Sequence, residues 1–530
     1  MSAVTKAIGL AKKLKHRYQD ELRARTPVYL SPVRRIEQVR LPKRICAMTF
    51  DDGPCRLPAN PSKDGKPLTL SLLESLEQYG ARGTFDIVGD TSENYPDKAG
   101  KEGSASWGGV KFDHYPDIHK DADGGAVHCP ELVQRILDGG HEITSHTYRH
   151  VLYGPKPLVY GGRQPFDSLL EVVDDLKRLD DLMRKDYGYE IKLSRPPHYV
   201  DKTRDGFTSY DAHALLGYQY MAASFDGAGW LPLASYEAEV EAMLAPMERA
   251  LAENPDCLCG QIIFQKDGYN MARRSPVADA LPKQLALLKE YGYRVVTVSE
   301  LLIMCPFADL SPESPVFAPA KALLDAGWCV CYRDNTVRPD AVLTRGEACM
   351  LAFGWKTAAR RLDLVKTKTN VCRDVSYRHP YAAAIEQALE RGCLQQGNGR
   401  FRPDDPISRE EMAVMLVRAL GYGTLVQSLS GLELPFDDIT DNRGYIAIAY
   451  DIGMITGGAG AGGQLKFLPR DSATREEAAA MLVRVYERYT SKLDWLHGFY
   501  AFSSYSQIDL TASMDAVSVG WARMEYDPAA

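Results

Sequence analysis

The chain has 530 residues, far more than one ordinary domain uses, so its length alone predicts three or four domains. Hydrophobic residues make up 45% and charged residues 25%, as in typical globular proteins, and no apolar run is long enough to span a membrane. The net charge of -7 and the lack of a basic stripe after residue 44 argue against a nucleic-acid partner.

Residues 1–44 form a basic N-terminal segment. Residues 3–25 could form a basic amphipathic helix, either simply solvated or in contact with an acidic surface. No apolar core of a secretory signal follows the basic residues, so no signal peptide is visible.

Between residues 45 and 304, strand-like runs alternate with helical stretches. After a first strand near Ile45–Met48, strands are expected at Gly83–Gly89, Gly140–Ser145, Tyr218–Ala223, Gly260–Phe264 and Arg294–Val298. Helices are expected at Leu68–Tyr79, Cys129–Leu137, Phe166–Tyr187, Tyr236–Leu251 and Ala278–Tyr291. This rhythm predicts an α/β barrel or a doubly wound sheet, with an active site at the carboxyl ends of the strands.

The first strand ends in Asp51 and Asp52, followed by the turn residues Gly53-Pro54. Two adjacent carboxylates repel each other, so a positive group must lie beside them. A divalent metal does this, with one carboxylate as ligand and the other as base for a bound water. Such a stretch on its own is more often a solvated turn.

A second strand is followed by His146 and His150. A separation of four residues places two imidazoles on one side of a helical turn, where both can bind one ion. Together with Asp52 they form a two-histidine, one-carboxylate set with open positions for water and substrate.

The third motif is Arg195-Pro196-Pro197-His198-Tyr199. The prolines restrict the backbone and so direct Arg195, which suits a guanidinium that must hold a carboxylate in one orientation.

These three motifs, in this order, resemble those of the polysaccharide deacetylases of carbohydrate esterase family 4, over residues 45–304. The resemblance implies a distorted (β/α) barrel and a divalent metal, zinc foremost, with cobalt or another divalent ion possible. By position, Asp51 would be the general base and Arg195 the residue that orients it. The implied metal ligands are Asp52, His146 and His150.

The sequence also departs from the family pattern. Gly229 replaces the second acid of the family's Asp-x-x-Asp-Trp motif, and Gln265 is assigned to the place of the general-acid histidine. Glutamine cannot release a proton at neutral pH, so a general-acid contribution of about 10²–10⁴-fold would be lost. Tyr199 and Trp230 are expected either as apolar walls for an acetyl methyl group or as ordinary core.

After residue 305 one pattern occurs three times. In each copy a second helix opens with Ser or Thr followed three residues later by Glu, which is a capping box. The boxes begin at Thr344, Ser408 and Thr474, and the arginine after each recurs at spacings of 64 and 66 residues. Such regular spacing indicates a duplicated unit.

The three units resemble S-layer homology domains, with boundaries near 305–368, 369–432 and 433–490. The resemblance implies an all-α anchor that binds a secondary cell-wall polymer. Because an exposed guanidinium beside a helix N-terminus suits an anion, the expected polymer contacts are Arg345, Arg409 and Arg475.

Residues 491–530 are expected to be the start of a further domain. Within them, Trp495–Phe502 and Met514–Trp521 are expected as two strands joined by a polar turn. They resemble the start of a glycoside hydrolase family 18 domain. Forty residues cannot close a barrel, so we expect either a truncated chain or strands packed on the anchor.

These features predict a metal-dependent N-deacetylase of cell-wall polysaccharide, such as peptidoglycan or a chitin-like polymer of N-acetylglucosamine. The anchor repeats favour an extracellular, cell-wall or S-layer location, although no signal peptide is visible. The alternative is a weakened or inactive deacetylase-like domain that serves as a wall-binding module, because both acid positions are altered.

Overall fold

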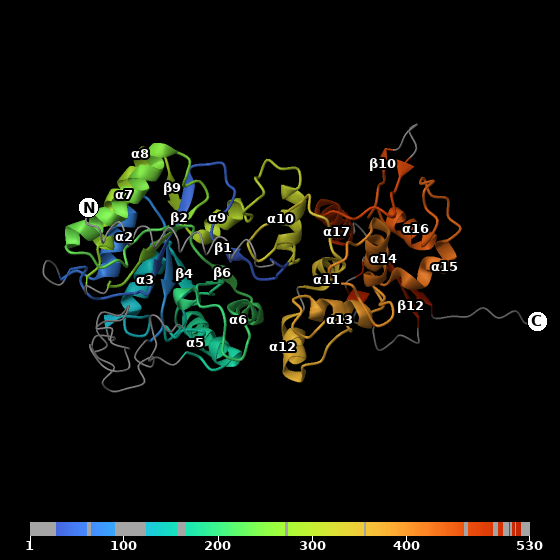
Figure 1. The fold of residues 1–530 in the computed structure, drawn as a ribbon, viewed down its shortest axis with the longest axis horizontal. Helices are drawn as coiled ribbons and strands as arrows, with labels where there is room; N and C mark the ends of the chain where they lie inside the picture. Colours follow the sequence, from blue (N-terminus) through green and yellow to red (C-terminus); the bar gives the residue numbers. More distant parts are fainter. Residues whose placement is uncertain are drawn as a thin grey trace, which may run out of the picture.

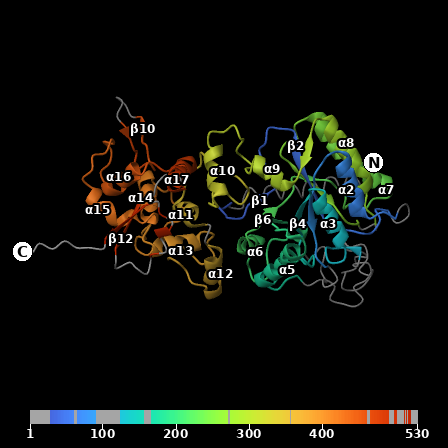
Figure 2. The same ribbon diagram turned by 180° about the vertical axis from the view of Figure 1, so that it is seen from behind.

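The structure is a computed structural model that describes residues 28–60, 65–90, 123–155, 165–270, 274–354, 357–459, 465–490, 497–501, 508, 511–512, 514 and 516–520. An α/β half and a helical half follow one another along the long axis (Figures 1 and 2). The helix predicted over residues 3–25 lies outside the described residues.

The first half is built on a sheet of nine described strands, all paired in parallel. The order is β1-β6-β5-β4-β3-β2-β8-β7, with β9 also paired to β2. The strands are β1 (Arg35–Ile36), β2 (Ile45–Asp51), β3 (Thr84–Ile87), β4 (Glu142–Ser145), β5 (Leu193–Ser194), β6 (Gln219–Met221), β7 (Phe225–Asp226), β8 (Ile262–Lys266) and β9 (Arg294–Val296). The predicted fold class, a distorted barrel of parallel strands and helices, is confirmed.

Helices cover this sheet and bury its central strands. They are α2 (Leu68–Gln78), α3 (Pro130–Asp138), α5 (Leu169–Tyr187), α6 (Ser209–Leu216), α7 (Tyr236–Glu253), α8 (Val277–Glu290) and α9 (Val298–Met304). All seven residues of β2 are buried, as expected for a strand of a parallel sheet that is covered on both faces. The carboxyl end of β2 is therefore held rigidly.

The elements without a counterpart in the sequence prediction include β1, β5, β7 and α6. The three strands are two residues long, and so short a run shows no alternation of polar and apolar residues. β1 lies within the segment that was predicted to precede the domain, and it pairs with β6.

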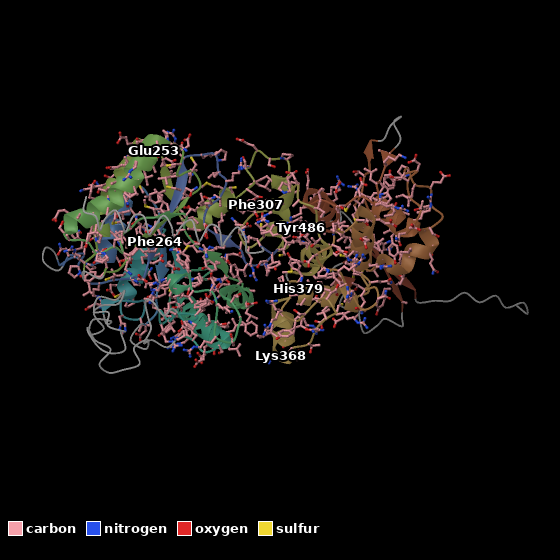
Figure 3. The ribbon with its side chains drawn as sticks, in the orientation of Figure 1. Glu253, Phe264, Phe307, Lys368, His379 and Tyr486 are labelled. Atoms are coloured by element: carbon pink, nitrogen blue, oxygen red, sulfur yellow. The ribbon has the colours of Figure 1, made fainter. Side chains whose placement is uncertain are left out.

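The segment that contains β1 also joins the two halves. Leu30 N donates to Tyr381 Oη (3.0 Å), and Ser31 N donates to the carbonyl of Cys331 (3.1 Å). The buried Arg34 donates through Nη1 to the carbonyl of Pro306 (3.0 Å). Phe307, labelled in Figure 3, is fully buried and belongs to an apolar core that includes residues of both halves. The sheet and the first helical unit are thus packed together.

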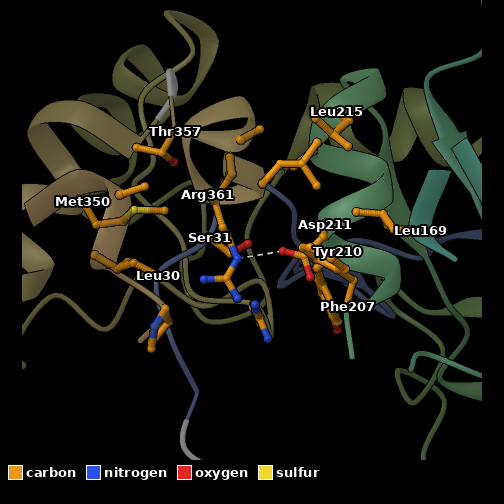
Figure 4. A pocket seen from close by; sticks show the side chains of 17 residues that line it. Leu30, Ser31, Leu169, Phe207, Tyr210, Asp211, Leu215, Met350, Thr357 and Arg361 are labelled. Carbon is orange, nitrogen blue, oxygen red and sulfur yellow. Dashed lines mark hydrogen bonds and ion pairs between the residues drawn. The ribbon is translucent and has the colours of Figure 1, made fainter. Parts of the chain in front are cut away.

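A small, largely apolar pocket lies at this junction, and Figure 4 shows the ion pair that bridges it. Arg361 of α12 (Ala358–Thr367) donates through Nε to Asp211 of α6 at 2.7 Å. Arg333, from the first helical unit, lies over the ring of Tyr210 at 4.6 Å. Polar and apolar contacts therefore both connect the halves here.

The helical half contains three similar units. Their first helices are α10 (Phe317–Asp325), α13 (Ala382–Glu390) and α16 (Arg443–Asp451), and their second helices are α11 (Arg345–Phe353), α14 (Arg409–Ala419) and α17 (Arg475–Thr490). Smaller elements are η6 (Tyr422–Leu425), α15 (Val426–Leu429), β10 (Gly458–Ala459) and β11 (Leu465–Lys466). The predicted capping boxes of α11, α14 and α17 are all present.

The three units close into a ring. Leu343 N donates to the carbonyl of Ala473, Ala473 N to Ile407, and Ile407 N to Leu343. Each unit therefore contacts the other two, so the ring depends on all three.

The arginines at the start of the second helices stabilise this ring, and they are not the exposed groups that the sequence predicted. Arg345 and Arg475 are each 3% exposed. Arg345 donates to the carbonyl of Phe401 (3.0 Å) and to Glu411 (2.5 Å), both in the second unit. Arg409 contacts the third unit in the same way, and Arg475 donates to the carbonyl of Val337 in the first unit at 2.7 Å.

Two short strands follow the ring, β12 (His497–Ala501) and β13 (Ala516–Gly520). They form a two-stranded sheet in the predicted region, but the pairing is parallel. A polar turn cannot connect a parallel pair, which needs a longer crossover, so that part of the prediction is wrong. The likeness to glycoside hydrolase family 18 stays a prediction.

We expect Arg345→Met to lower the free energy of unfolding of the helical half by about 1.5–3 kcal/mol, because a buried charged donor is lost. Urea unfolding of the full chain, followed by far-UV circular dichroism, measures the change. Arg378→Met is the matched control, because Arg378 is exposed in the same half. Equal effects of the two substitutions would contradict the role of Arg345 in the ring.

Candidate functional site

The site lies where β2 ends. Asp51 is the last residue of the strand, and Asp52 follows it with a φ of 78°, a conformation that few residues other than glycine adopt. Gly53 lies so close to the side chain of Asp267, the residue that follows β8, that a Cβ would lie 2.0 Å from Asp267 Oδ2. The absence of a side chain at Gly53 is what allows this turn.

The two histidines lie at the end of β4. The predicted helical turn is absent: residues 146–150 form an irregular bend in which Thr147 and His150 have positive φ. Asp175 of α5 fixes the bend, because its buried carboxylate accepts hydrogen bonds from Tyr148 N (2.8 Å) and Arg149 Nε (2.7 Å). The imidazoles are thus positioned by a loop tied to a helix.

Asp52, His146 and His150 converge as the sequence predicted. Nε2 of His146 lies 3.3 Å from Asp52 Oδ1, and Nε2 of His150 lies 3.1 Å from the same oxygen. Among the described residues these three form a set that could hold a metal ion, and all three are buried.

The donor atoms fit a divalent ion. A tetrahedral zinc ion with bonds of about 2.0–2.2 Å separates its ligand atoms by roughly 3.3–3.5 Å, close to the spacings found here. His146 Nδ1 donates to the carbonyl of Arg195 at 2.8 Å, which leaves the lone pair of Nε2 available to an ion. An overlapping set, Asp51, Asp86 and His146, would need that same Nδ1 as ligand and is therefore disfavoured.

The predicted partner of Asp51 is in place. Arg195 is 1% exposed and donates through Nη1 to Asp51 Oδ1. Two further contacts hold the guanidinium: Nη1 to Thr49 Oγ1 (3.0 Å) and Nη2 to the carbonyl of Ala222 (3.1 Å). This carboxylate therefore has one orientation.

Burial and neighbouring charges shift the pKa values of the site. Burial raises the pKa of Asp51 to about 7, against the opposing effect of Arg195 and His146. Burial alone would also raise the pKa of Asp52, but Lys266 and the two imidazoles hold that pKa well below its usual value. The two neighbouring carboxyls thus differ strongly in how easily they take a proton, as a base and a ligand must.

The side chain that β8 presents to the site is Lys266, not Gln265. Asp51 pairs with Lys266 in the β2–β8 ladder, so these two share a face, whereas Gln265 pairs with Phe50 on the opposite face. Lys266 donates through Nζ to Asp52 Oδ2. Gln265 is fully buried on the helix side, where its Nε2 donates to Gln284 of α8 at 2.7 Å. The sequence prediction placed Gln265 at the acid position, but the residue that faces the site there is the next one, Lys266.

Gly229 lies against the same helix layer. A Cβ there would be 2.7 Å from Val277 Cγ2 and 3.4 Å from Met243 Cε, so an acidic side chain has no room without repacking. Trp230 is 41% exposed, and its Nε1 donates to Asp226 at 3.1 Å. Tyr199 is 37% exposed and lies parallel to Tyr220. Neither aromatic residue is ordinary core.

Two further buried acids, Asp86 and Asp267, lie beside the site. Asp86 of β3 is fully buried, accepts a hydrogen bond from Thr144 Oγ1 (2.6 Å), and lies 2.8 Å from His146 Nδ1. Asp267 accepts from Thr69 Oγ1 (2.7 Å). The available signal was a charged residue near the carboxyl end of a strand: Lys266 is the last residue of β8, and Asp86 is the next-to-last residue of β3.

Two stretches of the chain match known protein families. Residues 38–214 match the family model for polysaccharide deacetylase, and residues 373–413 match the model for the S-layer homology domain. The chain therefore contains a region similar to polysaccharide deacetylases, which are hydrolases, and a region similar to the S-layer homology domain.

Individual proteins are similar to parts of this chain. A peptidoglycan-N-acetylglucosamine deacetylase of Bacillus cereus is 28% identical over 262 residues, 49% of this chain and 89% of the relative. A cell surface protein of Thermoanaerobacter kivui is 30% identical over 132 residues, 24% of this chain and 16% of the relative. The solved structure of peptidoglycan deacetylase PdaC from Bacillus subtilis is 21% identical, covers 50% of this chain and 90% of that chain, and has a TM-score of 0.31.

We expect Arg195→Met to lower the free energy of unfolding of the sheet domain by about 3–5 kcal/mol, because Asp51 then keeps a buried charge without its partner. The double variant Arg195→Met/Asp51→Asn should recover part of this loss. Urea unfolding followed by tryptophan fluorescence gives both values. Arg204→Met, which breaks an exposed pair with Asp167, should cost less than about 1 kcal/mol; strictly additive losses in the double variant would contradict the pairing.

Proposed function

We propose that the sheet domain removes N-acetyl groups from a cell-wall polysaccharide, either peptidoglycan or a chitin-like polymer of N-acetylglucosamine. The observation that carries this proposal is the convergence of Asp52, His146 and His150 on one point beside the Asp51–Arg195 pair. The three side chains would hold a divalent ion, zinc foremost.

The chain's own residues have distinct tasks in this proposal. When bound, the ion supplies a Lewis acid for the amide carbonyl and makes a nearby water more acidic. Asp51 takes the proton from that water, and Arg195 keeps the carboxylate aimed at it. Tyr199 and Trp230, both partly exposed, would line the acetyl group.

One observation favours a second candidate, a glycan-binding domain that hydrolyses slowly or not at all. A buried ammonium faces Asp52, at the strand end where the family resemblance leads one to expect a histidine as general acid. Binding to the polymer without acetate release would support this candidate over the first.

We further propose that the helical half anchors the protein to a secondary cell-wall polymer at the cell surface, through three S-layer homology units. The closed ring of similar units supports this proposal. Among the motif arginines, the side chain of Arg409 is the most exposed, at 15%, so it is the one we propose for direct polymer contact. Among the described residues no single helix is long and apolar enough to span a membrane. The two consecutive segments Arg409–Ala419 and Tyr422–Leu429 reach that length and hydropathy only when they are taken together, and the chain bends by 109° between them.

Acetate release from peptidoglycan or chitin oligomers, with added Zn²⁺, tests the enzymatic proposal. We expect Asp51→Asn to lower the rate by about 10²–10⁴-fold because the general base is lost. Asp256→Asn is the control, since that carboxylate is 66% exposed and pairs with Arg44 on the surface. Equal rates for the wild type and Asp51→Asn would refute the assignment.

Sedimentation of the full chain with purified cell walls tests the anchor. We expect binding to intact walls and its loss once the non-peptidoglycan polymer has been extracted with acid. Arg409→Gln should weaken binding, whereas Arg378→Gln should leave it unchanged. Undiminished binding to extracted walls would assign the attachment to the peptidoglycan instead.

A further inference from the structure

The feature that carries a further inference is the ammonium of Lys266. Its side chain is 3% exposed and ends at the carboxyl edge of the sheet. It donates to Asp52 Oδ2, whereas the imidazoles of His146 and His150 approach Oδ1. The two oxygens of the Asp52 carboxylate thus have different partners. Oδ1 faces the ion site, and Oδ2 accepts a hydrogen bond from the Lys266 ammonium.

This arrangement affects any ion bound by Oδ1. The ammonium already neutralises much of the charge of Asp52, and its own positive charge repels a divalent cation held by the same carboxylate. The contact also fixes the orientation of the carboxylate, which favours binding through one oxygen rather than two. Lys266 therefore both positions Asp52 and weakens its attraction for the ion.

A second buried charge acts in the opposite direction. Asp51 pairs in register with Lys266 of β8 on one side and with Asp86 of β3 on the other. Asp86 is fully buried and lies 2.8 Å from His146 Nδ1. Its negative charge therefore adds to the attraction for a cation at Nε2 of the same ring.

We infer that Lys266 and Asp86 are a pair of positioning residues that sets how tightly the Asp52–His146–His150 site binds a divalent cation. Lys266 lowers the affinity and Asp86 raises it. This inference rests on the proposed function to the extent that the cation is held by these three side chains.

The structure allows the two charges to be removed separately. Lys266→Met preserves the approximate shape of the side chain without its charge. In Asp86→Asn the Oδ1 atom can still accept from Thr144, and His146 Nδ1 can still donate to the carbonyl of Arg195. The substitution at Asp86 thus removes a charge while the imidazole keeps its orientation.

The experiment is a titration of the chelator-treated full chain with Co²⁺, followed by visible absorption, and with Zn²⁺, followed by calorimetry. We expect Lys266→Met to bind at least about tenfold more tightly and Asp86→Asn at least about tenfold more weakly, as expected for one unit charge removed a few ångströms from the ion. The double variant should lie within about threefold of the wild type, because the two changes oppose each other.

Two controls keep the comparison interpretable. Lys283→Met removes an exposed charge from α8 and should leave the affinity unchanged. If Lys266→Met does not fold, as judged by circular dichroism, Lys266→Gln provides the same loss of charge with a donor to Asp52 retained.

The outcomes separate this inference from the proposed function. A wild type that binds Co²⁺ as tightly as the Lys266 variants overturns the inference and leaves the metal site standing. Binding by the Lys266 variants alone supports the inference in its strongest form. If neither the wild type nor any variant binds either ion, both the inference and the metal-dependent function are overturned.

Discussion

The structure depends on burying several charges at the carboxyl edge of one sheet. Asp51, Asp52 and Asp86 are each less than 9% exposed, and Arg195, Lys266 and two imidazoles lie among them. Removing an ion from water costs several kcal/mol, which only well-placed opposite charges and hydrogen bonds offset. These side chains are therefore stable as a set, and the loss of any one leaves a partner buried and uncompensated.

The parallel sheet brings most of these side chains together on neighbouring strands. In-register pairing places Lys266, Asp51, Asp86 and Thr144 side by side on four neighbouring strands. The remaining side chains of the site come from loops. Asp52 and His150 both adopt positive φ, and Asp175 accepts a hydrogen bond from the bend that carries His146. Backbone conformations of this kind tend to occur at functional sites, where the surrounding packing holds them.

The helical half shows a different use of buried charge. All three motif arginines donate to backbone carbonyls of another unit, and Arg345 and Arg409 also donate to a glutamate there, so the charges hold the ring closed. The glutamates of the capping boxes thus serve twice, since Glu411 caps α14 and also accepts from Arg345. The N-terminal segment and the Arg361–Asp211 pair connect this ring to the sheet domain.

The sequence by itself determined the parallel α/β class, the repeated helical units and the set formed by Asp52, His146 and His150. Each of these leaves a local mark in the sequence: alternating strands and helices, capping boxes at regular spacing, and short motifs after strands. Only the tertiary structure decided which neighbouring residue of β8 faces the site. Strand alternation turns Gln265 toward α8 and Lys266 toward Asp52, and a shift of one residue exchanges the two faces. The burial of Arg345 and Arg475 was likewise decided by the ring, because the carbonyls and carboxylates around them come from other units, more than fifty residues away in the sequence.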